Sequence, residues 1–477
     1  MRSAAAAIAG ALAAASVGGA QAHAPTRAAA APTAVTISLG RPRPAIASRF
    51  LGLSFEARDL PGVARLATRG DLVALLRSLG PGTLRFGGNS VDATTAWYDG
   101  QGRRPRWARV LVSPQDLDGI ARLARATGWN VLLAVTLGHP DPAAAAREVA
   151  AARARLGPAL AGVEIGNEPD QYVSKRLRRR PWGYSRYRAE VARYRAAIAA
   201  AAPGVRLAGP DLASAKPSRW LAAYARRERP SLLTAHFYPL IRCGHDRPTI
   251  SQLMSADLRL SEQRVLDRLA SLAARSRRPL RIGETNNVAC SGQPGVSDTY
   301  ASALWALDYL VRAVDAGVRG VNFHGFLAEC RTYTPLCARS RPELASGSLA
   351  ARPEWYALLA ARSLAGARPL ATRVAPARND LTVIAVRSPR GGIDAILVNL
   401  GARPIRIALR VPPRLRTSAL IRLTGPSLAA RSGVRLGGRA VDRHGGWSAA
   451  GARLPARRGA LTVTLGAFSA AVVSARP

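Results

Sequence analysis

The sequence predicts an α/β fold, a (β/α)8 TIM barrel, with a C-terminal all-β sandwich domain. Over about 300 residues, short apolar strands alternate with Ala-, Leu- and Arg-rich stretches of helical spacing. Beyond Gly366, short β patterns separated by Gly and Pro turns continue without a helix of comparable length. A doubly wound open sheet is the alternative, and it is disfavoured because no Gly-rich phosphate loop follows the first strand.

Eight apolar segments predict the barrel strands. They are Phe50–Glu56, Thr83–Gly88, Val131–Gly138, Gly162–Glu168, Val205–Asp211, Leu232–Pro239, Leu280–Asn286 and Gly320–Phe326. Apolar residues at helical spacing predict helices over Tyr184–Ala202, Gln263–Ala274, Asp298–Ala316 and Pro353–Leu364. Another helix is expected to start at Ser113, because a capping Ser is followed by Pro114 and, at the third helical position, by Asp116.

The chain divides into a leader, a linker, the barrel and the β domain. Residues 1–24 are predicted to be a secretory signal peptide, because Arg2 is followed by an apolar run and then by small residues near the expected cleavage site. The alternative is an Ala-rich low-complexity tail. Residues 25–47 predict a linker and a strand, Val35–Leu39, expected to join the β domain. The barrel is expected over 48–365 and the sandwich over 366–477, with strands Leu381–Val386, Ile393–Asn399, Ile405–Val411, Ala419–Leu423 and Leu461–Leu465.

The net charge of +40 does not by itself indicate a nucleic-acid partner. Only two of the 69 basic residues are lysines, and the arginines are scattered along the chain. One cluster, Lys175–Arg180, is either a solvated loop or a patch that attracts an acidic substrate. No internal stretch approaches about 18 apolar residues, so we expect no membrane span. We also expect a secreted monomer that has no nucleic-acid partner.

Four cysteines are expected to form disulfides in an exported chain. Cys243, Cys290, Cys330 and Cys337 allow three pairings, and no CxxC or HExxH pattern indicates a metal. His139, His236 and His324 lie near strand ends, so a metal site is the alternative there. Without an acidic spacing motif they are interpreted as hydrogen-bonding residues, and neither metal nor cofactor is expected.

Two glutamates end strands well separated around the predicted barrel. Glu168 follows the fourth strand in GVEIGNEPDQY, where Pro169 stops the strand, and Glu284 ends the seventh in LRIGETNN. Strand carboxyl ends build the active site of such a barrel. Paired carboxylates suit glycoside hydrolysis, in which one protonates the leaving oxygen while the other attacks the anomeric carbon or activates water. A lone Glu would instead be interpreted as a helix cap or a partner of Arg.

The motifs extend over most of the chain. They are Leu84–Asp92, Val163–Pro169, His236–Pro239, Gly283–Asn286, Ser297–Tyr300 and Trp355-Tyr356. In these segments the chain resembles clan A glycoside hydrolases and, within them, family 79, which contains heparanase and the microbial β-glucuronidases. The resemblance implies that Glu168 is the acid/base, Glu284 the nucleophile, Asn167 a ligand of the sugar 2-hydroxyl and Tyr238 the residue that orients Glu284.

Other roles implied by the resemblance have structural alternatives. Arg85 either holds Glu284 ionised or pairs with Glu164 inside the barrel. Three residues match positions that line the uronic acid subsite in this family: Glu56, Asn89 and Asp92. The alternative interpretation is that they are helix caps and turn residues. Tyr333 either contacts the carboxylate of the sugar or packs in its loop.

One departure from the family concerns the loop after the nucleophile. Heparanase-like members have a Tyr and a Gly-rich turn there, whereas this chain has Ala289 followed by Cys290, Ser291 and Gly292, whose backbone N–H groups would hold the uronate carboxylate. We expect the disulfides Cys330–Cys337, which closes a short loop, and Cys243–Cys290, which would fix both loops at the mouth in place of the Tyr.

The predicted function is therefore that of a retaining β-glucuronidase acting on a β-linked glucuronide or uronic-acid-containing glycan. The alternatives are another clan A β-glycosidase, an endo-acting heparanase-like enzyme, and a non-catalytic polyanion- or glycan-binding protein.

Overall fold

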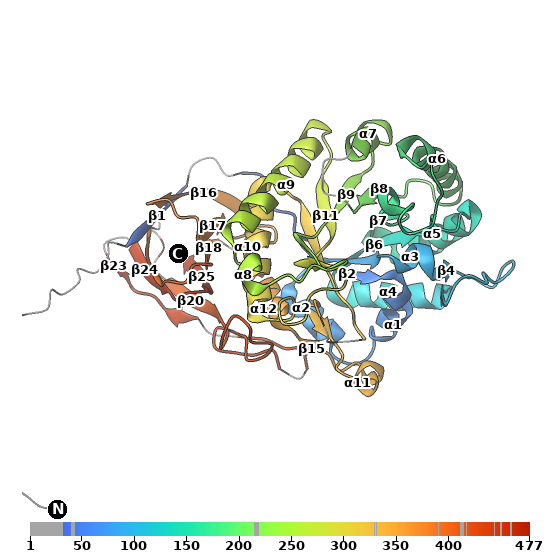
Figure 1. Ribbon diagram of the computed structural model, residues 1–477. Coiled ribbons are helices and arrows are strands. Elements are labelled where there is room, and N and C mark those ends of the chain that lie inside the picture. The colour runs from blue at the N-terminus through green and yellow to red at the C-terminus, as the bar shows by residue number, and fades with distance from the viewer. Residues whose placement is uncertain are drawn as a thin grey trace, which may run out of the picture.

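The barrel and the β domain lie side by side in the computed structural model (Figure 1). The structure describes residues 32–39, 43–213, 219–328, 330, 332–389, 391–410, 415, 417–442, 444–448, 451–457 and 460–477. The expected signal peptide, 1–24, and the first part of the expected linker lie outside the described residues. Within them, no helix has the length and apolar character needed to cross a membrane.

Eight parallel strands form the barrel, as the sequence predicts. In sheet order they are β7 (Leu160–Ile165), β6 (Asn130–Val135), β3 (Thr83–Gly87), β2 (Leu51–Glu56), β13 (Gly320–His324), β11 (Leu280–Thr285), β9 (Leu232–Phe237) and β8 (Ala208–Leu212). An isolated bridge between Val163 and Leu207 joins the two outer strands, so the ring is nearly closed. The predicted barrel fold is confirmed.

Helices connect the strands and cover the barrel. The main ones are α2 (Leu72–Leu79), α4 (Pro114–Thr127), α5 (Pro142–Leu156), α6 (Tyr184–Ala201), α7 (Arg219–Arg227), α9 (Ala256–Arg275), α10 (Tyr300–Ala316) and α12 (Pro353–Ala361). Ser113 and Asp116 cap each other's backbone N–H groups at the start of α4, as predicted. Helix α9 starts seven residues before the predicted Gln263, because Ser255 caps it.

Short elements fill the loops at the two ends of the barrel. They are α1 (Leu60–Arg65), α3 (Ser90–Ala93), α8 (Ile250–Leu253), α11 (Arg341–Ser346), the 3-10 turns η1 (Ala57–Asp59), η2 (Gly157–Ala159), η3 (Pro169–Gln171) and η4 (Arg362–Leu364), and the strands β4 (Thr95–Trp97), β5 (Val110–Val112), β10 (Leu240–Ile241), β12 (Val288–Ala289), β14 (Leu336–Cys337) and β15 (Ala350–Ala351).

The β domain is one sheet folded into two layers. One layer holds β21 (Arg435–Leu436), β20 (Thr417–Thr424), β25 (Ser469–Arg476), β18 (Ile393–Asn399) and β17 (Leu381–Arg387), with β22 (Ala452–Arg453) beside β20. Strand β16 (Arg368–Ala375) continues into the other layer, β1 (Thr33–Ser38), β19 (Ile405–Arg410), β24 (Ala460–Leu465) and β23 (Ala456–Arg457). Strand β1 pairs with β16 and β19, so the N-terminal strand lies in this domain.

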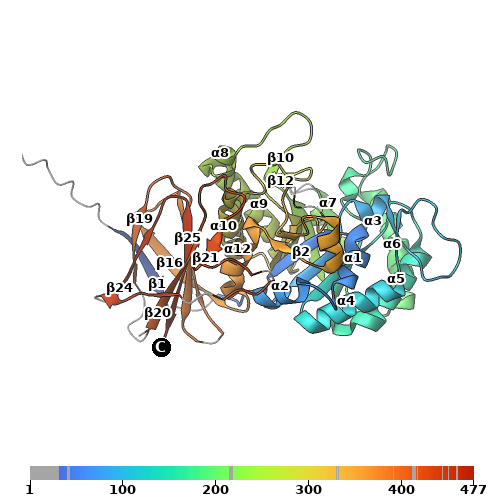
Figure 2. The same ribbon diagram turned by 90° about the horizontal axis from the view of Figure 1, so that it is seen from below.

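The β domain packs on α10 and α12 of the barrel (Figure 2). In strands β17 and β18, which lie in the layer next to the barrel, alternate residues face the sandwich core and the barrel. Ala385 and Leu397 point into the sandwich core, whereas Ile384 and Val398 join the core of the barrel. The Tyr300 hydroxyl donates to the carbonyl oxygens of Leu423 and Phe468, at 2.9 and 3.1 Å.

Candidate active site

Glu284 is a buried carboxylate held from two sides. It lies near the end of β11, where Tyr238 donates to Oε1 at 2.8 Å and Arg85 donates to Oε2 at 3.0 Å. Burial raises the pKa of Glu284, but His324, His236, Arg85 and the bond from Tyr238 together hold it well below its usual range. Glu284 is therefore ionised over the whole range of ordinary pH.

Glu168 follows β7 and also carries two partners. The backbone at Glu168 is left-handed, with φ of 54°, a costly conformation for a side-chain-bearing residue and one that clusters at functional sites. Its N–H donates to the carbonyl of Asp211 at 2.9 Å. His236 Nδ1 lies 3.0 Å from Oε1, and the Lys175 ammonium lies 2.6 Å from Oε2. Burial raises the pKa of Glu168, while His236 and Lys175 lower it to a net value below the usual range.

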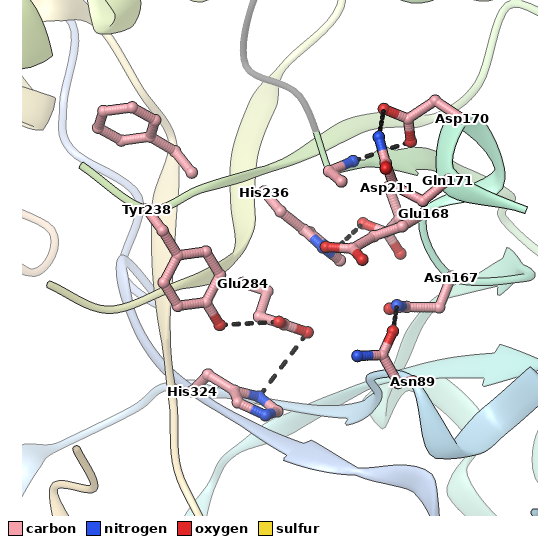
Figure 3. A network of polar contacts seen from close by, with 12 residues as sticks. Asn89, Asn167, Glu168, Asp170, Gln171, Asp211, His236, Tyr238, Glu284 and His324 are labelled. Atoms are coloured by element: carbon pink, nitrogen blue, oxygen red, sulfur yellow. Dashed lines mark hydrogen bonds and ion pairs between the residues drawn. The ribbon is translucent and has the colours of Figure 1, made fainter. Parts of the chain in front are cut away.

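The two carboxylates face each other across the barrel mouth with His236 between them (Figure 3). One oxygen of Glu168, one of Glu284 and a ring nitrogen of His236 all lie within 4.8 Å of one another. His236 is completely buried, and its Nε2 lies 3.3 Å from Asp211 Oδ1. Burial lowers the pKa of His236, but Glu284 and Asp211 raise it to about 10, so the imidazole is charged at neutral pH.

Arg85 links several of these groups beneath the site. This fully buried guanidinium on β3 contacts Glu164 at 2.8 Å and both Asp211 and Glu284 at 3.0 Å. It also donates to Asn167 Oδ1 at 2.9 Å and to Ser54 Oγ at 3.1 Å. Arg85 therefore contacts both of the partners considered from the sequence, Glu164 and Glu284, and its role in holding a nucleophile ionised stays a prediction.

Asn167 and Asn89 lie beside Glu168 with amide groups turned toward the mouth (Figure 3). Asn167 is buried, and its Nδ2 lies 3.5 Å from Asn89 Oδ1. Asn89 is exposed, and its Oδ1 accepts from Lys175 at 2.5 Å. Both side chains therefore border Glu168 at the mouth of the barrel (Figure 3).

Asp92 differs from its expected place in the uronate subsite. It is buried, and both carboxylate oxygens accept hydrogen bonds from the protein. Oδ1 accepts from the N–H groups of Leu137 and Gly138, both at 2.8 Å, and Oδ2 accepts from Asn167 N–H at 2.8 Å and the Tyr172 hydroxyl at 2.7 Å. Asp92 is saturated, so it organises the loops that position Asn167 rather than contacting a ligand.

We therefore expect Asp92→Asn to destabilise the protein by about 3 kcal/mol, because one accepting oxygen becomes an NH2 donor that faces N–H or O–H donors, and these donors lose their partner. Urea unfolding measures this. Asp118→Asn, at an exposed pair with Arg155, should change stability by less than about 1 kcal/mol. Unchanged stability in Asp92→Asn would return this residue to the list of candidate ligands.

The loops after β9 and β11 are joined near the two glutamates. Both expected disulfides, Cys243–Cys290 and Cys330–Cys337, are present. Cys290, Ser291 and Gly292 are all left-handed, with φ of 62°, 67° and 79°. Arg242 donates to the carbonyl of Gly292 at 3.0 Å, which places a cation beside this turn.

Tyr333 and Glu56 border the same region. Tyr333 is buried, its ring centroid lies 6.0 Å from that of Tyr238, and a side chain at Gly292 would collide with it. This contact satisfies the packing interpretation and leaves Tyr333 next to the 290–292 turn. Glu56 Oε2 accepts from Ser90 N–H at 2.7 Å, so this residue caps α3, and its Oε1 lies 3.8 Å from His324 Nε2.

Several solved glycoside hydrolases have this architecture. A 4-O-α-L-rhamnosyl-β-D-glucuronidase from Fusarium oxysporum 12S matches with a TM-score of 0.74 and 18% identity, covering 92% of this chain and all of that one. The GH51 arabinofuranosidase from Xanthomonas axonopodis pv. citri has a TM-score of 0.69 and 14% identity, covering 93% of this chain and 100% of that chain. A GH30 endoxylanase from Clostridium papyrosolvens C71 has a TM-score of 0.56 and 13% identity, with coverage of 93% and 100%. The chain has the fold of these glycoside hydrolases.

Sequence comparison adds one short match. A curated β-glucuronidase from Neurospora crassa is 39% identical over 46 residues, which is 10% of this chain and 8% of that protein. No known protein-family profile matches the chain. The glycoside hydrolase fold expected from the motifs is thus supported, while membership of family 79 stays a prediction.

Glu168, His236 and Glu284 have atoms close enough to share a metal ion. The chemistry of the donors does not fit one. Each of the four carboxylate oxygens already faces a donor from Lys175, His236, Tyr238 or Arg85, three of which carry positive charge. A further cation would have to displace these partners.

Sequence reasoning passed over four contributors to this site. His236 was grouped with hydrogen-bonding histidines, Lys175 with a solvated or substrate-attracting cluster, and Asp211 and Arg242 received no role. His236 and Asp211 could have been found, because each comes at the carboxyl end of a predicted barrel strand. Lys175 and Arg242 lie in loops whose paths no sequence pattern indicates.

Proposed function

We propose that this protein is a retaining β-glycoside hydrolase and that its substrate is a β-glucuronide. The facing pair Glu168 and Glu284 carries this assignment, because one carboxylate oxygen of Glu168 lies within 4.8 Å of one carboxylate oxygen of Glu284. Retaining enzymes hold their two carboxyl groups about 5–5.5 Å apart, whereas inverting enzymes need about 6.5–9.5 Å to admit a water molecule. The short separation supports direct attack by Glu284 on the sugar.

The reaction proceeds in two displacements. Ionised Glu284 attacks the anomeric carbon as the bond to the leaving oxygen breaks, and Glu168 gives that oxygen a proton. Glu168 then takes a proton from water, which attacks the glycosyl–Glu284 ester and frees the sugar. Tyr238 and Arg85 fix the attacking carboxylate, and Asn167 binds the 2-hydroxyl.

The turn of Cys290, Ser291 and Gly292 supports the uronate assignment. The three successive left-handed residues form a tight turn, and tight turns can present several backbone N–H groups to an anion. Arg242 adds a positive charge beside the turn, and Tyr333 packs against Gly292. The names of the Fusarium and Neurospora proteins are consistent with the same sugar.

A panel of 4-nitrophenyl glycosides tests the assignment. We expect hydrolysis of the β-D-glucuronide, with the β-anomer of glucuronic acid appearing first in the proton NMR spectrum. Preference for the β-glucoside, β-xyloside or α-L-arabinofuranoside would overturn the sugar, and release of the α-anomer first would overturn retention. Binding to heparin without turnover of any glycoside would favour a non-catalytic glycan-binding protein.

The protonation of Glu168 predicts an acidic working range. Because its pKa in the free protein lies below the usual 4.5, the proton-bearing form dominates only below that value. Glu284, with its pKa also lowered, stays ionised there. We expect kcat/KM for a neutral aryl glucuronide to fall about tenfold per pH unit above about pH 5. A plateau through pH 7 would contradict this charge state.

We further propose export and a monomeric state. The two disulfides are compatible with a secreted protein.

A further inference from the structure

Glu168 has no free oxygen in the state that the structure shows. Oε1 faces His236 Nδ1 at 3.0 Å and Oε2 faces Lys175 Nζ at 2.6 Å. Both partners favour the carboxylate over the acid. The first displacement nevertheless requires Glu168 to carry a proton, so one of the two contacts has to open before the leaving oxygen is protonated.

His236 is poorly suited to move. Its side chain is fully buried on β9, and Asp211 backs its second ring nitrogen at 3.3 Å. Lys175 is different: it lies in the turns that follow η3, on a flexible four-carbon stem, and 24% of its side chain is exposed. Its other partner is Asn89, an exposed neutral amide, at 2.5 Å. Lys175 is the contact that can open.

The location of Lys175 indicates what would draw it away. An acid/base residue touches the oxygen that leaves, so an ammonium bound to Glu168 lies next to the leaving group and away from the attacking Glu284. A negative charge on the leaving group, close to the broken bond, would compete with Glu168 for this ammonium. One of only two lysines in the chain occupies this position, among 69 basic residues.

We propose that Lys175 is a positioning and specificity-determining residue, whose ammonium clamps Glu168 in the free enzyme and passes to an anionic group of the leaving group when substrate binds. The preferred substrates would carry a carboxylate or sulfate near the scissile bond. This inference rests on the proposed function. As Lys175 leaves, Glu168 takes one proton from solvent on Oε2 and keeps His236 on Oε1. It then gives that proton to the leaving oxygen as the glycosidic bond breaks.

Other charged groups around Glu168 remain in place in this exchange. His236 comes from β9, Glu284 from β11, and Asp211 on β8 and Arg85 on β3 lie behind them. Buried Tyr333 also faces this group from the loop after β13. Among these charged groups, Lys175 is the one that comes from a loop, and its side chain is only partly buried.

Two matched substrates test the clamp. Both are aryl β-glucuronides with equal leaving-group acidity, one bearing a ring sulfonate beside the glycosidic oxygen and the other a neutral sulfonamide. In the wild type, we expect the alkaline decline of kcat with pH (the basic limb) to lie at higher pH for the sulfonate substrate than for the sulfonamide. At pH 6, kcat/KM for the sulfonate should be at least about tenfold larger.

Lys175→Met should remove both differences and move the basic limb for the neutral substrate to higher pH. Lys175→Arg should retain part of the preference, because the charge remains. Arg186→Met removes one exposed positive charge from the nearby helix α6 and should behave as wild type. Its circular dichroism and melting temperature, compared with those of Lys175→Met, separate folding from function.

Three outcomes would count against the clamp while leaving the proposed function standing. They are equal loss on both substrates in Lys175→Met, an unmoved basic limb, and the same loss of preference in Arg186→Met. Wild type that cleaves neither substrate nor any other β-glucuronide would instead overturn the proposed function and the clamp with it.

Discussion

Glu284→Gln should abolish turnover of β-glucuronides, with kcat lowered about 10⁵-fold, the order expected when a covalent nucleophile is removed. Glutamine has the same shape, so Tyr238 keeps an acceptor, but the neutral amide cannot form the glycosyl ester. The site is built around the ionised form, because Arg85 and His236 both favour negative charge on residue 284. Release of nitrophenol near pH 4.5 measures the loss, and circular dichroism verifies the fold.

The stereochemistry of azide rescue separates the two glutamates. In Glu284→Ala, azide enters from the face that the carboxylate left and gives the α-glucuronosyl azide. In Glu168→Ala, azide attacks the ester on Glu284 and gives the β-anomer, because water no longer has a base. If Glu284→Gln stays within about tenfold of wild-type kcat, or if the two variants give the same anomer, the assigned roles are wrong.

The sequence predicted the barrel strands because they are apolar, evenly spaced and ended by polar residues. That pattern also located Glu284 within β11 and Glu168 three residues after the end of β7, since the carboxyl ends of the barrel strands meet at one mouth. Strands β16 and β25 were missed. Strand β16 carries Arg and Pro among its apolar residues, and β25 is rich in Ala, which has low β propensity.

The hydrogen-bond and ion-pair partners of the side chains in the site could not be predicted in the same way. The contacts of Asp92 could not be predicted from the sequence, because its five donors come from two loops, residues 136–138 and 167–172, that only the fold brings together. Arg85 was expected to have one of two partners and has both, because strands β7, β8 and β11 converge around its guanidinium. Such contacts depend on tertiary distances that no local pattern encodes.

Arg85→Met should destabilise the protein by about 3–5 kcal/mol at pH 7, the cost of leaving buried charges without their partner. The substitution would leave three buried carboxyl groups without their shared cation: Glu164, Asp211 and Glu284. Burial and Asp211 already raise the pKa of Glu164 to about 8 with the arginine present. Urea unfolding at pH 7 measures the change, and Arg43→Met, at an exposed pair with Asp315, should cost less than about 1 kcal/mol.

The pH dependence of that loss identifies its cause. In the wild type the pKa values of Asp211 and Glu284 are lowered, so their stabilisation is complete above the unfolded values near 4 and disappears as pH falls through the folded values. Without Arg85 their folded pKa values rise, and protonation relieves the buried charge in acid. The difference in unfolding free energy should therefore shrink between pH 7 and pH 4. A loss independent of pH would indicate missing packing around the arginine stem rather than unpaired carboxylates.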